Sequence, residues 1–368
     1  MSTKKDKFSS KDRTYMEIAL KLAKSRHGHT GPNPSVGCVI VKNDKIISIG
    51  QTSINGRPHA EFNAIKNSVD SVKGSKMYVT LEPCCHHGLT PPCTDLIIKS
   101  KFSQVIYSVA DIDKRMMNKS FKILKSNNIV VKKGLLEKKI KIFYSPYFLN
   151  KKKKLPYVTG KIAVSKNNLI YSKLDKKITN MQSDKFTHLL RYKNDSLLIS
   201  YKTLNKDNPR LNCRLKGMNK YSPKRIILDN KLRTNVKSFI IKTANEFNTI
   251  IFYNEAHKSR VFDLKKKKIK LIKSKIDNYK RFDFKSILKT LYKLNCRNLL
   301  IEGGDELTNY LLKNKIFDEF YFYRSNKKLS KKSDYLNFSS FNLLKHKYKK
   351  KINLKLNLRN NKITLYKR

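Results

Sequence analysis

The sequence predicts an α/β protein built from two domains. Its 368 residues are enough for two hydrophobic cores, and 39 % of them are apolar. Strand and helix patterns alternate along both halves of the chain, which is the order typical of α/β domains. A lysine block at 151–154, followed by Pro156, marks the linker between them. We therefore predict one domain over residues 1–150 and a second over residues 151–368.

The first half alternates helices with short apolar strands. Helices are assigned from apolar residues that recur every three or four positions, and strands from short runs rich in Val, Ile and Tyr. Pro58 is suited to the first turn of a helix. The predicted elements are, in order, a helix over 15–23, a hairpin of strands over 36–41 and 45–49, a helix from Pro58 to residue 65, a strand over 77–81, a helix over 94–99 and a strand over 105–109.

The second half again mixes strands with helices. Its predicted strands cover residues 157–164, 196–200, 225–228, 249–253 and 298–301. Apolar residues alternate over 352–358 and again over 363–365, on either side of an Asn360-Asn361 turn. This pattern predicts a hairpin at the end of a folded domain rather than a free basic tail.

The charge of the chain is strongly positive, with 82 Lys and Arg against 27 Asp and Glu, a net charge of +55. Such an excess is compatible with nucleic-acid binding. However, it is spread along the whole chain, and Lys accompanies Asn and Ile, residues that share AT-rich codons. Compositional drift therefore accounts for the charge better than a selected polyanion surface does, and we expect no specific nucleic-acid partner.

The location of the protein is predicted to be cytoplasmic. There is no apolar run of about 18 residues that would suggest a membrane span. Residues 1–15 contain no apolar segment of the kind found in secretory leaders. Six cysteines are too few for a disulfide scaffold in a chain of this length, so we expect thiols that bind metal or lie buried in a reducing compartment.

A metal site is indicated by His59-Ala60-Glu61, followed by Cys84 and Cys93. One His and two Cys are suitable zinc ligands that leave the fourth position for water. Glu61 is placed to take a proton from that water and to return it to a leaving amine. The order matches the signature of zinc deaminases, except that the second cysteine follows the first by nine residues instead of three. We predict one zinc ion per chain and a hydrolytic deamination.

Three stretches of the first half resemble the bifunctional riboflavin-biosynthesis deaminase/reductase family. Residues 83–93, PCCHHGLTPPC, resemble that family's PCxHxGRTPPC loop. Residues 31–38, GPNPSVGC, resemble its GxNPxVGCV stretch, and residues 79–84, VTLEPC, match its VTLEPC. The resemblance implies a cytidine-deaminase-like, three-layer domain in the first half.

The same resemblance assigns residues to roles. It implies that His59, Cys84 and Cys93 bind zinc, that Glu61 moves protons and that Asn33 holds the substrate ring. Either His86 or His87 is expected to touch the substrate, whereas Cys85 is expected to be a small filler and Cys38 a core residue. Leu89 replaces an arginine of the family loop, which removes one phosphate contact.

The second half carries a weaker signal. Residues 299–304, LLIEGG, precede an apolar helical pattern, and a strand, a diglycine and a helix can bring backbone amides close to a phosphate. Residues alone leave cofactor binding there open. Residues 203–214 resemble the family's reductase stretch TVLADDPRLTVR, 161–165 its LKxAxS segment, and 301–304 its xEGG segment.

This second resemblance implies a dihydrofolate-reductase-like domain, with a mixed sheet and helices on both faces, that uses NADPH. The residues that it assigns to the NADP site are Ala163, Thr203, Asp207 and Gly304, and those that it assigns to the ribose-phosphate substrate are Arg191, Leu211, Arg214 and Glu302. An arginine is suited to grip a phosphate through two parallel hydrogen bonds.

Two substitutions predict a weakened reductase. Asp175 and Lys177 occupy positions at which the family has a substrate-binding serine and a cofactor-stacking tryptophan. A carboxylate at position 175 is expected to repel a phosphorylated substrate unless neighbouring lysines compensate.

The function that the resemblance implies is riboflavin biosynthesis by a homo-oligomeric enzyme. The first domain would deaminate 2,5-diamino-6-(5-phosphoribosylamino)pyrimidin-4(3H)-one, and the second would reduce the ribosyl group to a ribityl chain with NADPH. Two alternatives stay open: an RNA or tRNA base deaminase that uses its positive charge, and a deaminase with a non-catalytic second domain. The nine-residue cysteine spacing and the second domain argue against the RNA deaminase.

Overall fold

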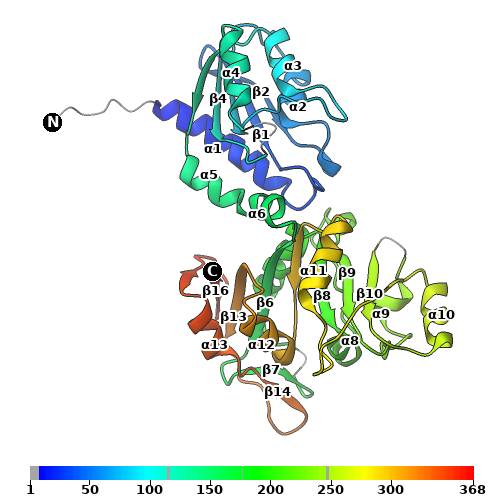
Figure 1. The fold of residues 1–368 in the computed structure, drawn as a ribbon. Coiled ribbons are helices and arrows are strands. Elements are labelled where there is room, and N and C mark those ends of the chain that lie inside the picture. The colour runs from blue at the N-terminus through cyan, green and yellow to red at the C-terminus, as the bar shows by residue number, and fades with distance from the viewer. Residues whose placement is uncertain (1–7, 114–116, 176, 246–247) are drawn as a thin grey trace. The chain divides into compact units, whose positions relative to one another are not determined.

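The chain divides into two compact units, with the division after Lys154 (Figure 1). The computed structural model describes residues 8–113, 117–175, 177–245 and 248–368. Residues 1–7, part of the segment inspected for a leader, lie outside the described residues. The lysine block is not a linker, because Lys151 to Lys153 form the last turn of helix α6 (Ser145–Lys153). Lys154, in a left-handed conformation, ends that helix.

The first unit has the predicted order of elements as far as residue 109, and further helices and a strand that were not predicted follow it. The elements of the unit are α1 (Ser10–Ser25), β1 (Gly37–Lys42), β2 (Lys45–Gln51), the short 3-10 helix η1 (Ile54–Gly56), α2 (Ala60–Lys66), β3 (Lys76–Leu81), α3 (Cys93–Lys99), β4 (Gln104–Val109), α4 (Lys119–Ser126), β5 (Val130–Lys133), α5 (Glu137–Phe143) and α6. Among the described residues, the strands form one sheet in the order β2-β1-β3-β4-β5, antiparallel at β2, β1 and β3 and parallel from β3 to β5. Pro58 does not open α2, which begins two residues later with His59 as its N-cap.

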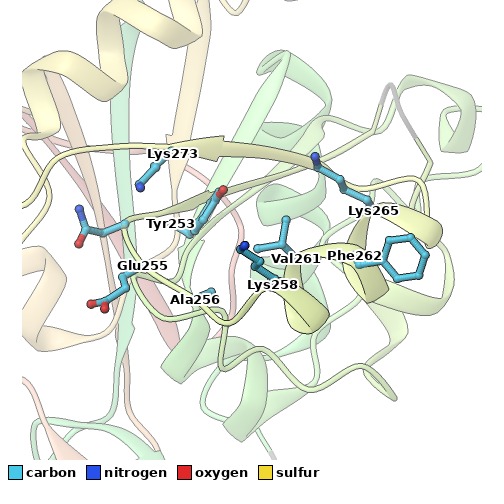
Figure 2. A pocket seen from close by; sticks show the side chains of 9 residues that line it. Tyr253, Glu255, Ala256, Lys258, Val261, Phe262, Lys265 and Lys273 are labelled. Atoms are coloured by element: carbon cyan, nitrogen blue, oxygen red, sulfur yellow. The ribbon is translucent and has the colours of Figure 1, made fainter.

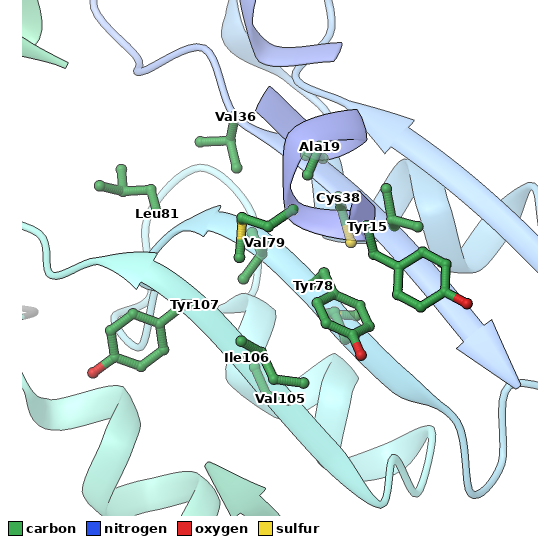
Figure 3. Close-up of a cluster of buried hydrophobic side chains, with 14 of the residues drawn as sticks. Tyr15, Ala19, Val36, Cys38, Tyr78, Val79, Leu81, Val105, Ile106 and Tyr107 are labelled. Atoms are coloured by element: carbon green, nitrogen blue, oxygen red, sulfur yellow. The ribbon is translucent and has the colours of Figure 1, made fainter. Parts of the chain in front are cut away.

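Helices cover both faces of this sheet because two glycines allow close approach. A Cβ atom at Gly37 would lie 1.9 Å from the Ala19 carbonyl oxygen in α1, and one at Gly50 would lie 2.2 Å from the Ala60 oxygen in α2. Gly50 pairs with Cys38, the neighbour of Gly37, so the two glycines face opposite sides of the sheet. The result is the predicted three-layer domain, whose core packs Tyr15 and Ala19 of α1 onto the strands (Figure 3).

The second unit contains the predicted mixed sheet. Its elements are β6 (Tyr157–Val164), β7 (Leu169–Ser172), α7 (Met181–Lys193), β8 (Ser196–Ser200), α8 (Tyr201–Asp207), the 3-10 helix η2 (Asn219–Tyr221), β9 (Lys224–Leu228), α9 (Phe239–Lys242), β10 (Thr249–Tyr253), α10 (Lys258–Lys266), β11 (Lys270–Lys273), α11 (Phe284–Lys293), β12 (Asn298–Ile301), α12 (Asp305–Lys313), β13 (Glu319–Ser325), β14 (Tyr335–Asn337), α13 (Phe341–Lys347), β15 (Lys350–Asn353) and β16 (Asn361–Lys367). The described strands of the main sheet follow the order β11-β10-β9-β8-β12-β6-β13-β16-β15.

Both faces of the main sheet are buried. Alternate residues of β8 belong to two different hydrophobic clusters. Leu198 belongs to one cluster, and Leu197 and Ile199 belong to the other. Such strands carry continuous apolar runs, which is why the predicted and observed ranges agree for β6, β8, β10 and β12. The predicted terminal hairpin is present as β15 and β16, but β15 ends at Asn353, so the apolar alternation that continues to Leu358 is not a strand.

The arrangement of β8, β12 and β6 determines where a site can form. These three strands are neighbours and run parallel, so their carboxyl ends meet at one edge of the sheet. In open α/β sheets, ligands bind in the crevice beyond that edge.

Candidate active sites

Three predicted ligands converge in the first unit. The Nδ1 atom of His59 lies 3.5 Å from the Sγ atom of Cys84 and 3.4 Å from that of Cys93. The three ligand atoms are all within 4.8 Å of one another, the one such group among the described residues. Ligands bound at about 2.0–2.3 Å to a tetrahedral zinc ion lie about 3.5 Å apart. The three side chains therefore fit zinc, with a fourth position available.

Each ligand is held by its own element. His59 caps α2, Cys93 is the first residue of α3, and Cys84 follows β3. The backbone N–H of Cys93 donates to the Sγ atom of Cys84 at 3.3 Å, which ties the ligand loop to α3. Glu82, at the end of β3, is buried and accepts hydrogen bonds from the N–H groups of Asp111 and Asn118. This anchor joins the ligand loop to the segments that follow β4.

Asn33 supports the segment that leads to His59. Its Nδ2 atom donates to the Gly56 carbonyl oxygen at 3.0 Å. Gly56 has a φ of 91°, and a Cβ atom there would lie 2.6 Å from the Asn33 Nδ2 atom, so only glycine fits. The predicted ring-binding residue thus lies against the segment that holds His59.

The acidity of the site residues is strongly perturbed. Glu61 is 4 % exposed, and its burial raises the pKa of the carboxyl to about 7. Hydrogen bonding from Cys93 lowers the pKa of the Cys84 thiol to about 4, whereas the same contact raises the pKa of Cys93. Zinc binding requires both sulfurs in the thiolate form.

Cys38, Cys85 and the two histidines of the ligand loop differ in burial. Cys38 is fully buried in the core, and Cys85 lies outside the ligand group. His86 is half-buried, whereas the His87 side chain is 80 % exposed and lies 3.9 Å from Asp95. Of the two histidines, the geometry therefore favours His86 for contact with a substrate.

In the second unit, Arg191 and Glu302 form a buried ion pair. The Arg191 Nε and Nη2 atoms donate to the two Glu302 oxygens at 2.8 and 2.9 Å. Burial opposes ionisation of Glu302, but the guanidinium outweighs it and lowers the pKa of the carboxyl to about 2. Arg191 also donates to the Asn212 carbonyl oxygen at 3.3 Å. Most of its donors are thus occupied within the protein, so Arg191 orients Glu302 rather than offering a free grip for a phosphate.

The segment at 211–214 lies against the same pair. Leu211 is 2 % exposed and has a φ of 50°, and Arg214 is exposed. The Arg214 Nη1 atom donates to the Asn212 side chain at 2.9 Å, which aims the guanidinium along the segment. The four residues predicted to bind the ribose-phosphate substrate therefore lie close together: Arg191, Leu211, Arg214 and Glu302.

Three of the four predicted cofactor residues lie at the carboxyl edge of the sheet. Ala163 is near the end of β6, Thr203 is in α8 directly after β8, and Gly304 caps α12 directly after β12. A Cβ atom at Gly304 would meet nothing within 4 Å, so space is open at the beginning of α12. Asp207 is exposed at the end of α8. Open space at a helix N-terminus beyond parallel strands fits a phosphate-bearing cofactor.

Asp175 has a compensating lysine, which is Lys327 rather than the neighbouring Lys177. Its carboxylate lies 2.9 Å from the Lys327 Nζ atom and accepts a hydrogen bond from the Ser330 N–H at 2.7 Å. Both contacts hold the pKa of Asp175 below its usual range. Lys177 lies 3.7 Å from Asp184, with a side chain that is 77 % exposed. The charge of Asp175 is thus neutralised within the protein.

Two further polar residues, Lys161 and His188, lie near the Arg191–Glu302 pair and were not singled out from the sequence. Lys161 lies in β6 with its Nζ atom 5.0 Å from the centre of the Tyr323 ring, and its burial lowers the pKa of the amine while Glu302 opposes that effect. His188 accepts a hydrogen bond from the Arg214 N–H at 3.3 Å. A lysine within an apolar strand was a usable signal for Lys161; nothing in the sequence pattern indicated His188.

A separate hollow lies at the carboxyl ends of β10 and β11 (Figure 2). Its volume is about 440 Å³, and Tyr253, Lys258, Lys265 and Lys273 are among its lining residues. None of the predicted site residues lines it.

Models of two protein families match the chain. The cytidine and deoxycytidylate deaminase zinc-binding region matches residues 9–109, and the RibD C-terminal domain matches residues 160–329. Curated relatives extend across both regions. The riboflavin biosynthesis protein RibD of Aquifex aeolicus is 35 % identical over 83 % of this chain and 85 % of its own length. That of Bacillus amyloliquefaciens is 34 % identical over 84 % and 83 %.

Solved structures show the same architecture. A deaminase/5-amino-6-(5-phosphoribosylamino)uracil reductase from Thermotoga maritima has a TM-score of 0.81 at 30 % identity. Acinetobacter baumannii RibD has a TM-score of 0.81 at 26 % identity. In both cases the similarity covers 97 % of this chain and 98 % of the other.

Proposed function

The chain belongs to the RibD family of riboflavin biosynthesis proteins, and on that premise we propose which of its residues carry the two reactions. It is a bifunctional enzyme, a zinc-dependent deaminase and an NADPH-dependent reductase. The deaminase acts on 2,5-diamino-6-(5-phosphoribosylamino)pyrimidin-4(3H)-one, and the reductase converts the ribosyl group into a ribityl chain. The similarity to these relatives favours a small-molecule substrate over RNA.

We assign the deamination to Glu61 beside His59, Cys84 and Cys93. The observation that carries this assignment is the convergence of three ligand atoms within 4.8 Å next to a buried carboxyl. His59, Cys84 and Cys93 would hold a zinc ion, which would supply an activated water for attack on C2 of the pyrimidine. Glu61 takes up a proton from the attacking water and delivers it to the amino nitrogen that leaves as ammonia. Burial raises the pKa of the Glu61 carboxyl, in the direction that suits a group that must both accept and donate a proton near neutral pH.

Metal analysis tests the ligand assignment. Cys84→Ser and Cys93→Ser are each expected to reduce zinc well below one ion per chain and to destabilise the first unit, because metal binding is coupled to folding. Cys85→Ser is the matched control, since Cys85 is adjacent and half-buried but outside the ligand group, and it should keep its zinc. Unchanged zinc in both ligand variants would contradict the assignment.

We assign the reduction to the edge of the second sheet. NADPH supplies the hydride, and Ala163, Thr203, Asp207 and Gly304 are proposed to line its site. Glu302, oriented by Arg191, and Leu211 and Arg214 are proposed to hold the substrate. Arg214 supports this role best, because its guanidinium is exposed and directed along the segment that contacts Arg191. An exposed guanidinium can bind a phosphate through two hydrogen bonds.

A turnover assay with the deaminated intermediate tests the reductase assignment without depending on the zinc site. The wild-type protein should oxidise NADPH, and Arg214→Ala should raise the KM for the intermediate by roughly 10- to 100-fold, the value of a charged hydrogen bond. Arg281→Ala serves as control, because Arg281 is partly exposed and paired with Asp277 in the same unit. Absence of NADPH oxidation in the wild type, with deamination intact, would mean that the second unit is not catalytic.

Three further points complete the proposal. We propose that the enzyme works in the cytoplasm, which the six free cysteines support. We propose a homo-oligomer, on the basis of the family resemblance, and no specific nucleic-acid partner. Among the described residues, no helix has the length and apolar character needed to span a bilayer.

A further inference from the structure

The substrate of the deaminase carries a phosphate, and the residues assigned to the site so far provide no cation for it. Phosphates bound in protein sites are met by arginine or lysine side chains through charge-assisted hydrogen bonds. The loop between the two cysteine ligands has Leu89 at the position of the arginine in the motif it resembles. The side chain of Leu89 is 88 % exposed, so this residue supplies neither charge nor packing.

Arg57 reaches the same part of the loop from a different segment. Its Nη1 atom donates a hydrogen bond to the Thr90 hydroxyl. Its Nη2 atom lies 3.7 Å from the point at which a Cβ atom of Gly88 would be. Gly88 and Thr90 are the two neighbours of Leu89, so the guanidinium lies beside the position from which the arginine is missing. Arg57 is also two residues before the zinc ligand His59, which places its charge next to the metal centre.

The positive charge of the Arg57 guanidinium does not serve to stabilise the fold. No carboxylate pairs with Arg57 among the residues that the structure describes. A second polar group nearby also lacks a partner: the Nδ1 atom of His86 is buried and makes no hydrogen bond within the described chain. The other nitrogen of that ring, Nε2, lies 3.8 Å from the same Gly88 position. Two nitrogen-bearing side chains therefore flank Gly88, and the protein itself satisfies neither fully.

We propose that Arg57 binds the 5′-phosphate of the substrate in the deaminase site, so that the positive charge comes from position 57 instead of position 89. His86 lies beside it and is available to the ribose or the phosphate. This inference rests on the deaminase assignment. A wild-type protein that releases no ammonia would refute that assignment, whereas the comparison below concerns Arg57 alone.

The competing explanation is structural: Arg57 would only hold the loop through its bond to Thr90. The two explanations differ in their dependence on the phosphate. A phosphate-binding residue matters only for the phosphorylated substrate, whereas a loop support matters equally for a substrate without that group. The dephosphorylated compound, 2,5-diamino-6-ribosylaminopyrimidin-4-one, is therefore the appropriate probe.

The experiment measures ammonia release from both compounds by wild type, Arg57→Gln and Arg57→Lys. We expect Arg57→Gln to raise the KM for the phosphorylated substrate by roughly 10- to 100-fold and to leave kcat/KM for the dephosphorylated compound unchanged. Arg57→Lys should recover part of the loss, because it keeps the charge without the two-pronged geometry. Arg13→Gln is the matched control, an exposed arginine of α1 in the same unit, and should behave as wild type for both compounds.

Two further measurements make the result decisive. Zinc content of Arg57→Gln should stay at one ion per chain, and restoration of the KM in Arg57→Gln/Leu89→Arg would support the need for one cation on this side of the loop. An equal loss for both compounds, or a loss of zinc, would overturn the proposal in favour of a loop support. An unchanged KM for the phosphorylated substrate would overturn it as well.

Discussion

Glu61→Gln is expected to keep its zinc ion and to lose deamination by roughly 10²- to 10⁴-fold, the range that general acid–base catalysis supplies. The amide has nearly the shape of the carboxyl but cannot accept and return a proton. Because Glu61 is buried in the first turn of α2 and is not one of the three ligands, the substitution should leave the metal geometry intact. Ammonia release and zinc content of the purified variant are the two measurements.

Two controls isolate the role of Glu61. Glu17→Gln changes a partly exposed carboxylate of α1, paired with Lys139, and should deaminate as wild type does. NADPH oxidation with the deaminated intermediate should continue in Glu61→Gln, since that reaction belongs to the other unit. Ammonia release by Glu61→Gln within a few-fold of wild type would contradict its role in proton transfer.

The zinc site could be predicted because its signal is local. His59 and Glu61 are two residues apart, and Cys84 and Cys93 follow within one loop, so residue types and spacing are enough to indicate the chemistry. The central strands were equally accessible, because parallel strands buried on both faces, such as β8 and β12, are continuous apolar runs bounded by polar residues.

Features that depend on distant parts of the chain could not be predicted. Asp175 is neutralised by Lys327, which is 152 positions away, and the sequence pattern contains nothing that pairs them. The same holds for Arg57, whose hydrogen bond to Thr90 joins two loops across 33 positions. Element boundaries failed where local propensity was misleading: Lys151 to Lys153 extend α6, since lysine is a good helix former and does not by itself mark a linker.

Glu302→Gln is expected to produce the largest loss of stability in the second unit, about 3–5 kcal/mol at pH 7. The ion pair with Arg191 is buried, with side chains 14 % and 11 % exposed, and removal of one partner leaves the other charge buried and unpaired. The reduction of the Glu302 pKa from 4.5 to about 2 gives a similar value, about 3 kcal/mol at 1.36 kcal/mol per unit. The matched control is Glu306→Gln, whose pair with Lys202 is 81 % and 60 % exposed and is worth no more than about 1 kcal/mol.

The pH dependence of the stability difference between wild type and Glu302→Gln follows from the direction of the pKa shift of Glu302. Glu302 has a lower pKa in the folded chain than in the unfolded chain, so between about pH 4.5 and 2 the unfolded state binds more protons. The contribution of the carboxylate is therefore complete above about pH 4.5 and disappears as the pH falls toward 2. The free energies of unfolding of wild type and Glu302→Gln should differ fully at pH 7 and converge at low pH. The contributions of the other carboxylates cancel in this comparison, because both proteins contain them. Hydrogen exchange of β12 and α7 in urea reports on the second unit alone, independently of zinc loss from the first. A loss of stability in Glu302→Gln that is as small as the loss in Glu306→Gln would show that the pair does not stabilise the fold. A difference in stability from wild type that persists at low pH would show the same.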